Sequence, residues 1–313
     1  MLTPEIKFVI FQLVIVVPFF SGFFLKQVML RLKDVSRKMV TLNLAMIEPP
    51  IVLWSIWGLA LSSEMIVLPF FGLLIVVAGF IFGRCAAPSL HFSKKGSKTF
   101  IISSSLANHG FTMGGFLCYL VSGEKGLALS SIFLVYFIPF TFLFIFSYAG
   151  FDKKRKWAAN DIRDFILTVR NMPLLAVMGA LLIKSMHIRR PDIFFPMDTF
   201  LIVSVALYYF TLGINFEPAD LKPFKKEHVM LAVEKFIFIP CVVFLFLCIS
   251  ALSQDVKQVI MIQSFMPAAI YSVVTSIIFD LDSRLASSLF VLNSLVFILI
   301  VLPIFALVGR SLF

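Results

Sequence analysis

The chain has 313 residues, of which 60% are apolar, only 14% are charged and 38 are phenylalanine. Soluble domains have about 45–50% apolar and about 25% charged residues, and disordered chains are poor in aromatic residues, so this composition excludes both classes. It predicts a protein whose surroundings are mostly lipid, and the meaning of the formal net charge of +10 depends on where the basic residues lie.

Ten stretches are long and apolar enough to cross the hydrocarbon core, which takes about 20 residues of helix. In chain order they are residues 6–25, 39–61, 65–83, 99–121, 126–149, 171–187, 194–216, 229–250, 256–279 and 285–308. The basic, amphipathic stretch 155–170 predicts an interfacial helix before the sixth span. We therefore expect an all-α membrane protein of ten transmembrane helices with no room for a soluble domain.

The basic residues distinguish the two sides of this expected membrane protein. Eighteen of the 27 Lys and Arg residues fall in the first, third, fifth, seventh and ninth loops, and seven fall on the other side. Because cytoplasmic loops carry the excess of positive charge, we expect a multi-pass protein of the plasma (inner) membrane with both termini outside. A nucleic-acid-binding protein gathers its basic residues on one face, so this spread argues against nucleic acid as a partner.

The basic segment 153–170 leaves five spans on each side of it. With an odd number of spans, the second half enters the membrane from the opposite side, so two halves of one fold are inverted repeats, as in many secondary carriers. The sequence predicts a first five-helix repeat over residues 1–152, a cytoplasmic linker over 153–170 and a second, inverted repeat over 171–313.

Helix-breaking residues occur at corresponding positions of the two halves. The fourth span contains the run Asn108-His109-Gly110 followed by Gly114 and Gly115, and the ninth contains Met266-Pro267. Glycine and proline are also common in membrane helices, which is the alternative explanation for either span alone. Their paired occurrence predicts broken crossover helices 4 and 9, whose free backbone groups and helix N-termini would attract an anion at the midplane.

These segments resemble motifs of the auxin efflux carriers and their bacterial relatives, ten-helix permeases distantly similar to the bile acid–sodium symporters. The matching elements are Asn108, Gly110 and Gly114 in the fourth span, Asn171-Met172-Pro173 in the sixth, Leu212 to Phe216 in the seventh, Lys235 to Pro240 in the eighth, and Met266-Pro267-Ala268-Ala269 with Leu302-Pro303 in the last two. One departure is Gly115-Phe116, where the family usually has a proline, and it bears on the shape of the cavity and hence on the substrate.

The resemblance implies a carrier of small organic anions, such as auxin or dicarboxylates, with its site where helices four and nine cross. It also implies that the first, second, sixth and seventh spans form a panel, or an oligomer face compatible with a homodimer. The other spans would form a core that moves against this panel.

Glu48 is the candidate for binding a coupling ion, H⁺ or Na⁺, because it lies near the middle of the second span, directly before Pro49 and Pro50. A carboxylate at that depth is by default a candidate functional group. The prolines cannot donate backbone hydrogen bonds, so they leave carbonyls of the preceding turn, those of Ala45 and Met46, without helical partners. The alternative is a protonated glutamate that caps one of these free groups.

The candidate substrate-binding and crossover residues gather at the two predicted breaks. They are Asn108, His109, Gly110, Gly114, Gln263, Ser264, Met266, Pro267 and Tyr271. Asn108 offers two donors and an acceptor either to a ligand or to a neighbouring helix. His109 either titrates with a coupled proton or packs between helices. Gln263 and Ser264 directly precede the ninth-span break, which favours both as site members.

Other polar residues of the spans are expected to hold helices together. Asn43, Asn215 and Asn293 lie near span centres, where amide side chains form hydrogen bonds between helices. Glu234 and Lys235 are neighbours in sequence, so they would point in different directions on a helix, with Lys235 reaching the cytoplasmic boundary.

The sequence contains no enzyme motif, no metal-ligand spacing and no nucleotide-binding loop, so it predicts neither catalysis nor a cofactor. We expect a secondary transporter that moves a small organic anion by alternating access, with that anion and membrane lipid as its partners. Two alternatives stay open. One is an uncoupled facilitator or channel-like uniporter, and the other is a membrane receptor that binds a solute without moving it.

Overall fold

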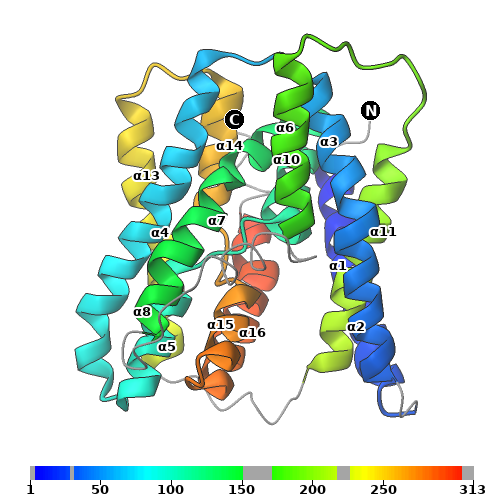
Figure 1. Ribbon diagram of the computed structural model, residues 1–313. Coiled ribbons are helices and arrows are strands. Elements are labelled where there is room, and N and C mark those ends of the chain that lie inside the picture. Colours follow the sequence, from blue (N-terminus) through cyan, green and yellow to red (C-terminus); the bar gives the residue numbers. More distant parts are fainter. Residues whose placement is uncertain (1–3, 29–31, 151–170, 217–225, 305–313) are drawn as a thin grey trace. The chain divides into compact units, whose positions relative to one another are not determined.

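The computed structural model describes residues 4–28, 32–150, 171–216 and 226–304 (Figure 1). All regular structure in these residues is helical, apart from one isolated bridge of β type between Ala107 and Ala268. The expected interfacial helix at 155–170 lies outside the described residues.

Six helices of the described residues are long and apolar enough to cross a membrane. They are Lys38–Gly58, Ser63–Leu90, Phe111–Tyr136, Met197–Asn215, Lys226–Cys248 and Ser283–Ile304. Two shorter apolar helices, Gln12–Leu25 and Met172–Ser185, accompany them. The described part of the chain is therefore an all-helical protein with membrane-compatible helices, as the composition predicts.

Contacts between residues divide the chain into two compact units, each assembled from separate stretches of sequence. The described parts of residues 1–63, 110–135 and 159–216 form unit 1. Those of residues 64–109, 136–158 and 217–313 form unit 2. Both halves of the sequence thus contribute to each unit.

Unit 1 contains two pairs of closely packed helices, in which α1 lies along α11 and α3 lies along α10. Its helices are α1 (Pro4–Leu25), α2 (Leu32–Leu42), the π-helical turn η1 (Asn43–Ile47), α3 (Glu48–Gly58), the π-helical turn η4 (Phe111–Gly115), α6 (Phe116–Phe133), α10 (Met172–Ser185) and α11 (Met197–Asn215). The short 3₁₀ turn η5 (Leu134–Tyr136) follows α6 along the chain.

The composition of unit 1 differs from the expected panel in two elements. The first, second, sixth and seventh predicted spans all belong to it, but so do η4 and α6, which the family resemblance places in the core. The physical reason is that the chain is not helical over residues 106–110, between α5 and η4, so the helical parts on either side pack independently. The part after residue 110 is η4 and α6, which kinks at Ser122 and Gly123 and continues into the predicted fifth span. Together η4 and α6 pack against α1, α3 and α11.

Two glycines allow α1 and α11 to approach each other closely. A Cβ atom added to Gly22 would collide with the Phe210 carbonyl, and one added to Gly213 would collide with the Phe19 carbonyl. Small residues at such a seam are what permits tight packing of membrane helices, because apolar lipid supplies little driving force of its own.

Gly213→Ala is expected to lower the free energy of unfolding by about 1–3 kcal/mol, because the backbone carbonyl that it would strike cannot move aside. Thermal unfolding of the purified protein in detergent measures this. Gly179→Ala on α10 is the matched control: nothing lies within 4 Å of its added Cβ, so stability is expected to stay equal or to rise. Equal melting temperatures for both variants would contradict the close packing of α1 on α11.

Unit 2 contains the remaining described helices. They are η2 (Ser63–Ile66, which leads into it), α4 (Val67–Ala86), η3 (Ala87–Leu90), α5 (Lys94–Ser105), α7 (Phe137–Phe140), η6 (Thr141–Phe146), α8 (Ser147–Gly150), α12 (Lys226–Val233), η10 (Glu234–Phe238), α13 (Ile239–Cys248), α14 (Gln254–Ser264), α15 (Ile270–Ile278), α16 (Ser283–Val296) and η11 (Phe297–Val301).

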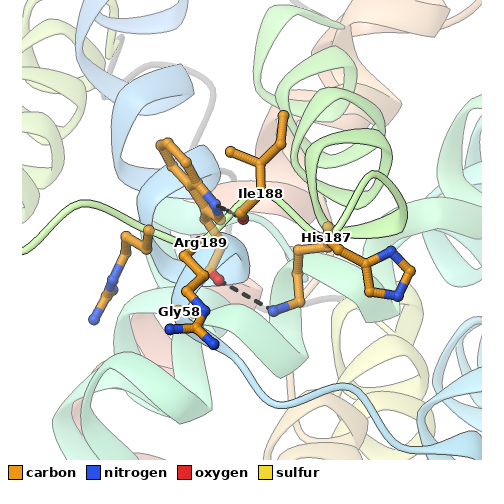
Figure 2. A pocket seen from close by; sticks show the side chains of 7 residues that line it. Gly58, His187, Ile188 and Arg189 are labelled. Carbon is orange, nitrogen blue, oxygen red and sulfur yellow. Dashed lines mark hydrogen bonds between the residues drawn. The ribbon is translucent and has the colours of Figure 1, made fainter.

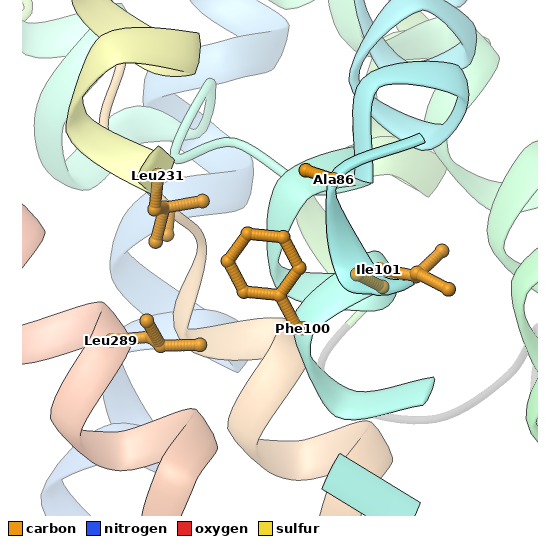
Figure 3. Close-up of a cluster of buried hydrophobic side chains, with 7 residues drawn as sticks. Ala86, Phe100, Ile101, Leu231 and Leu289 are labelled. Carbon is orange, nitrogen blue, oxygen red and sulfur yellow. The ribbon is translucent and has the colours of Figure 1, made fainter. Parts of the chain in front are cut away.

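A cluster of fully packed apolar side chains holds α5 in place within unit 2 (Figure 3). Phe100 of α5 lies among Ala86 of α4, Leu231 of α12 and Leu289 of α16, and none of its surface is exposed. Ala268, which follows α14, belongs to the same cluster. Helices from distant parts of the sequence therefore fix the position at which α5 ends.

Candidate functional site

Two stretches of non-helical backbone meet inside unit 2. The chain leaves helical geometry over residues 106–110, between α5 and η4, and again over residues 265–269, between α14 and α15. Residues 106–109 and 265–269 together are called the bridge region below. Proline explains the second stretch, because Pro267 has no N–H to continue α14 and disfavours helical geometry in the residue before it.

The two stretches pair through their backbones. The Asn108 N–H donates to the Pro267 carbonyl over 2.7 Å, and the Ala269 N–H donates to the Leu106 carbonyl over 3.1 Å. These bonds flank the antiparallel bridge between Ala107 and Ala268, both of which are buried. Backbone groups that α5 and α14 can no longer satisfy are thus satisfied by each other.

Polar side chains from other parts of unit 2 bind the remaining backbone groups of the bridge region. The Oδ1 atom of Asn293 on α16 accepts from the Ala268 N–H over 2.8 Å. The Nε2 atom of Gln263 donates to the His109 carbonyl over 3.2 Å. The ring Nδ1 of His109 and the Tyr136 hydroxyl lie 2.6 Å apart and share a hydrogen bond. The bridge region is therefore lined by amide, imidazole and phenol groups.

Two side-chain amide atoms of this lining have no hydrogen-bond partner among the described residues. They are Gln263 Oε1 and Asn293 Nδ2, on side chains that are 0% and 3% exposed. The orientation of each amide group is settled by the partner of its other atom. Gln263 Nε2 donates to a carbonyl, which leaves Oε1 free, and Asn293 Oδ1 accepts from an N–H, which leaves Nδ2 free. A buried polar atom without a partner costs about 1–3 kcal/mol. The acceptor Gln263 Oε1 and the donor Asn293 Nδ2, both at the bridge region, could therefore form hydrogen bonds with a polar ligand.

A buried ion pair lies at the end of α5. The Lys235 ammonium donates to the Ser104 carbonyl and lies 3.1 Å from Glu234 Oε1, with both side chains at most 1% exposed. A Cβ at Gly79 would approach both Glu234 and the Ser104 carbonyl, so the absence of a side chain there leaves room for the pair. The ammonium thus meets the partial negative charge at the C-terminus of α5.

This arrangement corrects the expectation that Glu234 and Lys235 point apart and that Lys235 reaches the membrane boundary. Both residues belong to the π-helical turn η10, whose geometry differs from the α-helix assumed for that expectation. The unsatisfied carbonyl at the end of α5 attracts the ammonium into the protein instead.

Five of the predicted site residues lie in the bridge region or bind to it. They are Asn108, His109, Gln263, Met266 and Pro267. Gly110 and Gly114 belong to unit 1, where Gly110 directly precedes η4 and Gly114 lies within it. Non-helical backbone therefore covers Asn108, His109 and Gly110 of the predicted disruption, whereas Gly114 and Gly115 lie in the π-helical turn η4.

Two further candidates have local roles in unit 2. The Ser264 hydroxyl donates to the Met261 carbonyl of its own helix over 2.7 Å. A serine within a helix commonly bonds to the preceding turn in this way instead of to another segment. The Tyr271 ring lies edge-on to the Phe137 ring at 5.0 Å between centroids. Conversely, Asn293 was expected only to hold helices together, and Tyr136 was not singled out. The sequence did offer one indication of Asn293, because it is a polar residue within the apolar tenth predicted span.

Glu48 forms a separate polar cluster in unit 1. The Asn43 Nδ2 atom donates to Glu48 Oε1 over 3.0 Å and to the Ser204 carbonyl of α11 over 3.2 Å. The Ser204 hydroxyl also donates to Glu48 Oε1, over 3.5 Å. Pro49 and Pro50 lie at the start of α3, which continues the helix from η1 without a break, so their missing N–H groups leave carbonyls of the preceding turn without helical partners.

A pocket of about 580 Å³ lies at the C-terminal ends of α3 and α10 (Figure 2). Its lining includes Trp57, Lys184 and Arg190. The Lys184 ammonium donates to the Trp57 carbonyl over 3.1 Å, and the Arg190 guanidinium donates to the Trp54 carbonyl over 3.3 Å. Arg190 also pairs with Glu124. These basic side chains therefore cap the last carbonyls of α3, which is a structural role.

The chain matches no protein-family model and no curated protein. Within the described residues, no group of His, Cys, Asp and Glu side chains is suited to hold a metal ion. The function is therefore argued from the bridge region of unit 2 and from the buried cluster around Glu48.

Proposed function

We propose that the protein is a secondary transporter that moves a small organic anion, such as a mono- or dicarboxylate, across the plasma membrane by alternating access. The observation that carries this proposal is the buried backbone bridge between Ala107 and Ala268. Within a membrane, non-helical backbone is tolerated only where protein or a water-filled cavity surrounds it. Paired interruptions of this kind are how many carriers build a substrate site near the midplane.

The groups at the bridge region suit an organic anion. Asn293 Nδ2 is a donor without a protein partner in the described residues, and α15 begins at Ile270, directly after the bridge region. A helix N-terminus carries a partial positive charge that favours a carboxylate. Gln263 Oε1 supplies an acceptor for a hydroxyl or a protonated group of the same solute. A solute with both a carboxylate and a donor group would satisfy both amides.

The architecture that accompanies this proposal has ten transmembrane helices in two inverted five-helix repeats. The interruptions at 106–110 and 265–269 then occupy equivalent positions of the two repeats. The distribution of basic residues favours both termini outside the plasma membrane. Resemblance to the auxin efflux carriers supports the same ten-helix architecture.

Two other functions are compatible with a polar bridge inside a helical membrane protein. An uncoupled facilitator would let the anion equilibrate, whereas a carrier coupled to an ion accumulates it above equilibrium. A receptor would bind the anion without moving it. The bridge favours transport over a receptor, because backbone interruptions in carriers allow the two ends of a span to move separately.

Uptake by purified protein in liposomes separates these functions. A panel of labelled mono- and dicarboxylates is tested under an imposed proton or sodium gradient, with wild type beside Asn108→Ala. We expect one class of anion to accumulate above equilibrium and to be released when an ionophore collapses the gradient. Equilibration without accumulation would indicate a facilitator, and a rise in melting temperature with anion but without flux would indicate a receptor. Neither flux nor binding for any anion would refute the proposal.

A further inference from the structure

Glu48 lies at the midpoint of its span, ten residues from each end of the helix Lys38–Gly58. With a rise of about 1.5 Å per residue, it is about 15 Å from either end, which is the depth of the bilayer centre. Its side chain is 3% exposed, and no Lys, Arg or His of the described residues forms an ion pair with it. An ionised carboxylate at this depth is strongly unfavourable unless its charge is neutralised.

The hydrogen bonds around Glu48 favour a proton over a metal cation as the neutralising species. Asn43 turns its NH₂ group toward the carboxyl, and its orientation is determined because the same group also donates to the Ser204 carbonyl. Sodium would require oxygen ligands in that place. The two donors, Asn43 Nδ2 and the Ser204 hydroxyl, both act on Oε1, so Oε2 is the oxygen that takes the proton.

The backbone next to Glu48 has an irregular hydrogen-bond pattern. The Glu48 N–H bonds to the Asn43 carbonyl five residues earlier, in the π-helical turn η1. The carbonyl of Ala45 would be paired with residue 49 in an α-helix or with residue 50 in a π-helix, and both are prolines without an N–H. The π-helical turn therefore does not restore a partner to the Ala45 carbonyl, which the prolines were expected to leave unpaired. Single π-helical turns of this kind are frequent at functional sites.

We propose that the Glu48 carboxyl, held by Asn43 and Ser204, binds and releases the proton that is coupled to anion movement. This inference rests on the proposed transport function for its coupling role, but proton binding by Glu48 can be tested without transport. When the proton leaves, Asn43 and Ser204 stabilise the carboxylate. When it returns, the neutral carboxyl suits the apolar surroundings.

Ionisable groups on the helices packed around Glu48 do not provide another charge for it. The described ones are Lys38 on α2, Cys118, Tyr119, Glu124 and Lys125 on α6, Lys184 on α10, and Asp198, Tyr208 and Tyr209 on α11. Among them, Tyr208 interacts electrostatically with Glu48. Tyr119 bonds to Asp198, Glu124 to Arg190 and Lys184 to the Trp57 carbonyl. Glu48 is therefore a buried carboxyl whose charge no neighbouring cation of the described residues compensates.

Infrared difference spectroscopy of the purified protein tests proton binding directly. We expect the carbonyl stretch of a protonated carboxyl to appear in wild type as the pH falls, and to be missing in Glu48→Gln. The control Glu124→Gln, which removes a carboxyl of the same unit from its ion pair, should retain the band. Ser204→Ala removes one donor to the carboxylate, so the band should persist to higher pH; this second variant serves if Glu48→Gln does not fold. Identical spectra for all four proteins at every pH would overturn the proposal.

Transport by the same proteins tests the coupling. In Glu48→Gln, proton-driven accumulation of the anion should fall at least tenfold, whereas exchange of labelled for unlabelled anion at equal pH should stay within about twofold of wild type. Glu124→Gln should behave as wild type in both assays. Undiminished proton-driven accumulation in Glu48→Gln, or accumulation that depends on sodium and not on protons, would overturn the coupling role. If wild type moves no anion at all, the proposed function fails instead, and the infrared band still decides whether Glu48 binds a proton.

Discussion

Lys235→Met is expected to lower the free energy of unfolding by about 3–5 kcal/mol, because it removes one partner of a buried ion pair and leaves Glu234 as an uncompensated charge. It also removes the donor to the Ser104 carbonyl at the end of α5. Denaturation of the purified protein, followed by helix content or by a melting temperature in detergent, measures the loss.

The matched control is Lys95→Met, which breaks an ion pair with Asp280 in the same unit. Its two side chains are 58% and 73% exposed, so the change in stability should be no more than about 1 kcal/mol. Adding Glu234→Gln to Lys235→Met should restore much of the lost stability, because the buried charge is then gone. Equal stability of Lys235→Met and Lys95→Met would contradict the view that the buried ion pair stabilises the end of α5.

Asn293→Asp is expected to reduce the apparent affinity for the transported anion by at least tenfold, at some cost in stability because the new carboxyl is buried. The aspartate keeps an oxygen that accepts from the Ala268 N–H, but it replaces the free NH₂ donor by a second oxygen. A hydrogen bond to a charged group contributes about 1.5–3 kcal/mol, which corresponds to about a tenfold to hundredfold change in affinity. The concentration dependence of initial uptake rates in proteoliposomes measures the effect.

Ser264→Ala is the control for this variant, since the Ser264 hydroxyl bonds to its own helix and not to the bridge region. Uptake by Ser264→Ala should match wild type. If Asn293→Asp also matched wild type, Asn293 would serve only to hold Ala268, and the anion would have to be bound elsewhere.

The sequence carries a signal for where the backbone is not helical, but none for the contact between the two non-helical stretches. Pro267 and the run Asn108-His109-Gly110 indicate where helical geometry is lost, because proline lacks an N–H and glycine is unfavourable inside a helix. Pairing between Ala107 and Ala268 joins residues far apart in the chain, and neither residue type carries a signal for it. The role of Asn293, which depends on that pairing, was for the same reason not predictable.

Local geometry explains the remaining differences. The expectation for Glu234 and Lys235 assumed a regular α-helix, and a π-helical turn replaces it. Ser264 lies beside Gln263 in sequence, but its short hydroxyl reaches the carbonyl three residues earlier before it reaches another segment. Glu48 could be singled out from the sequence, because a carboxylate deep in an apolar segment is a strong signal. Its partner Ser204, on a helix far away in the chain, could not.

Counterflow tests the central claim, that the chain is an anion carrier, most directly, because it needs no knowledge of the coupling ion. Liposomes containing the protein are loaded with an unlabelled carboxylate and diluted into a trace of the labelled one. We predict a transient accumulation of label above its equilibrium value for one class of carboxylate, reduced at least tenfold in Asn293→Asp and unchanged in Ser264→Ala. Label that enters no faster than into protein-free liposomes, for every carboxylate of the panel, would contradict the account.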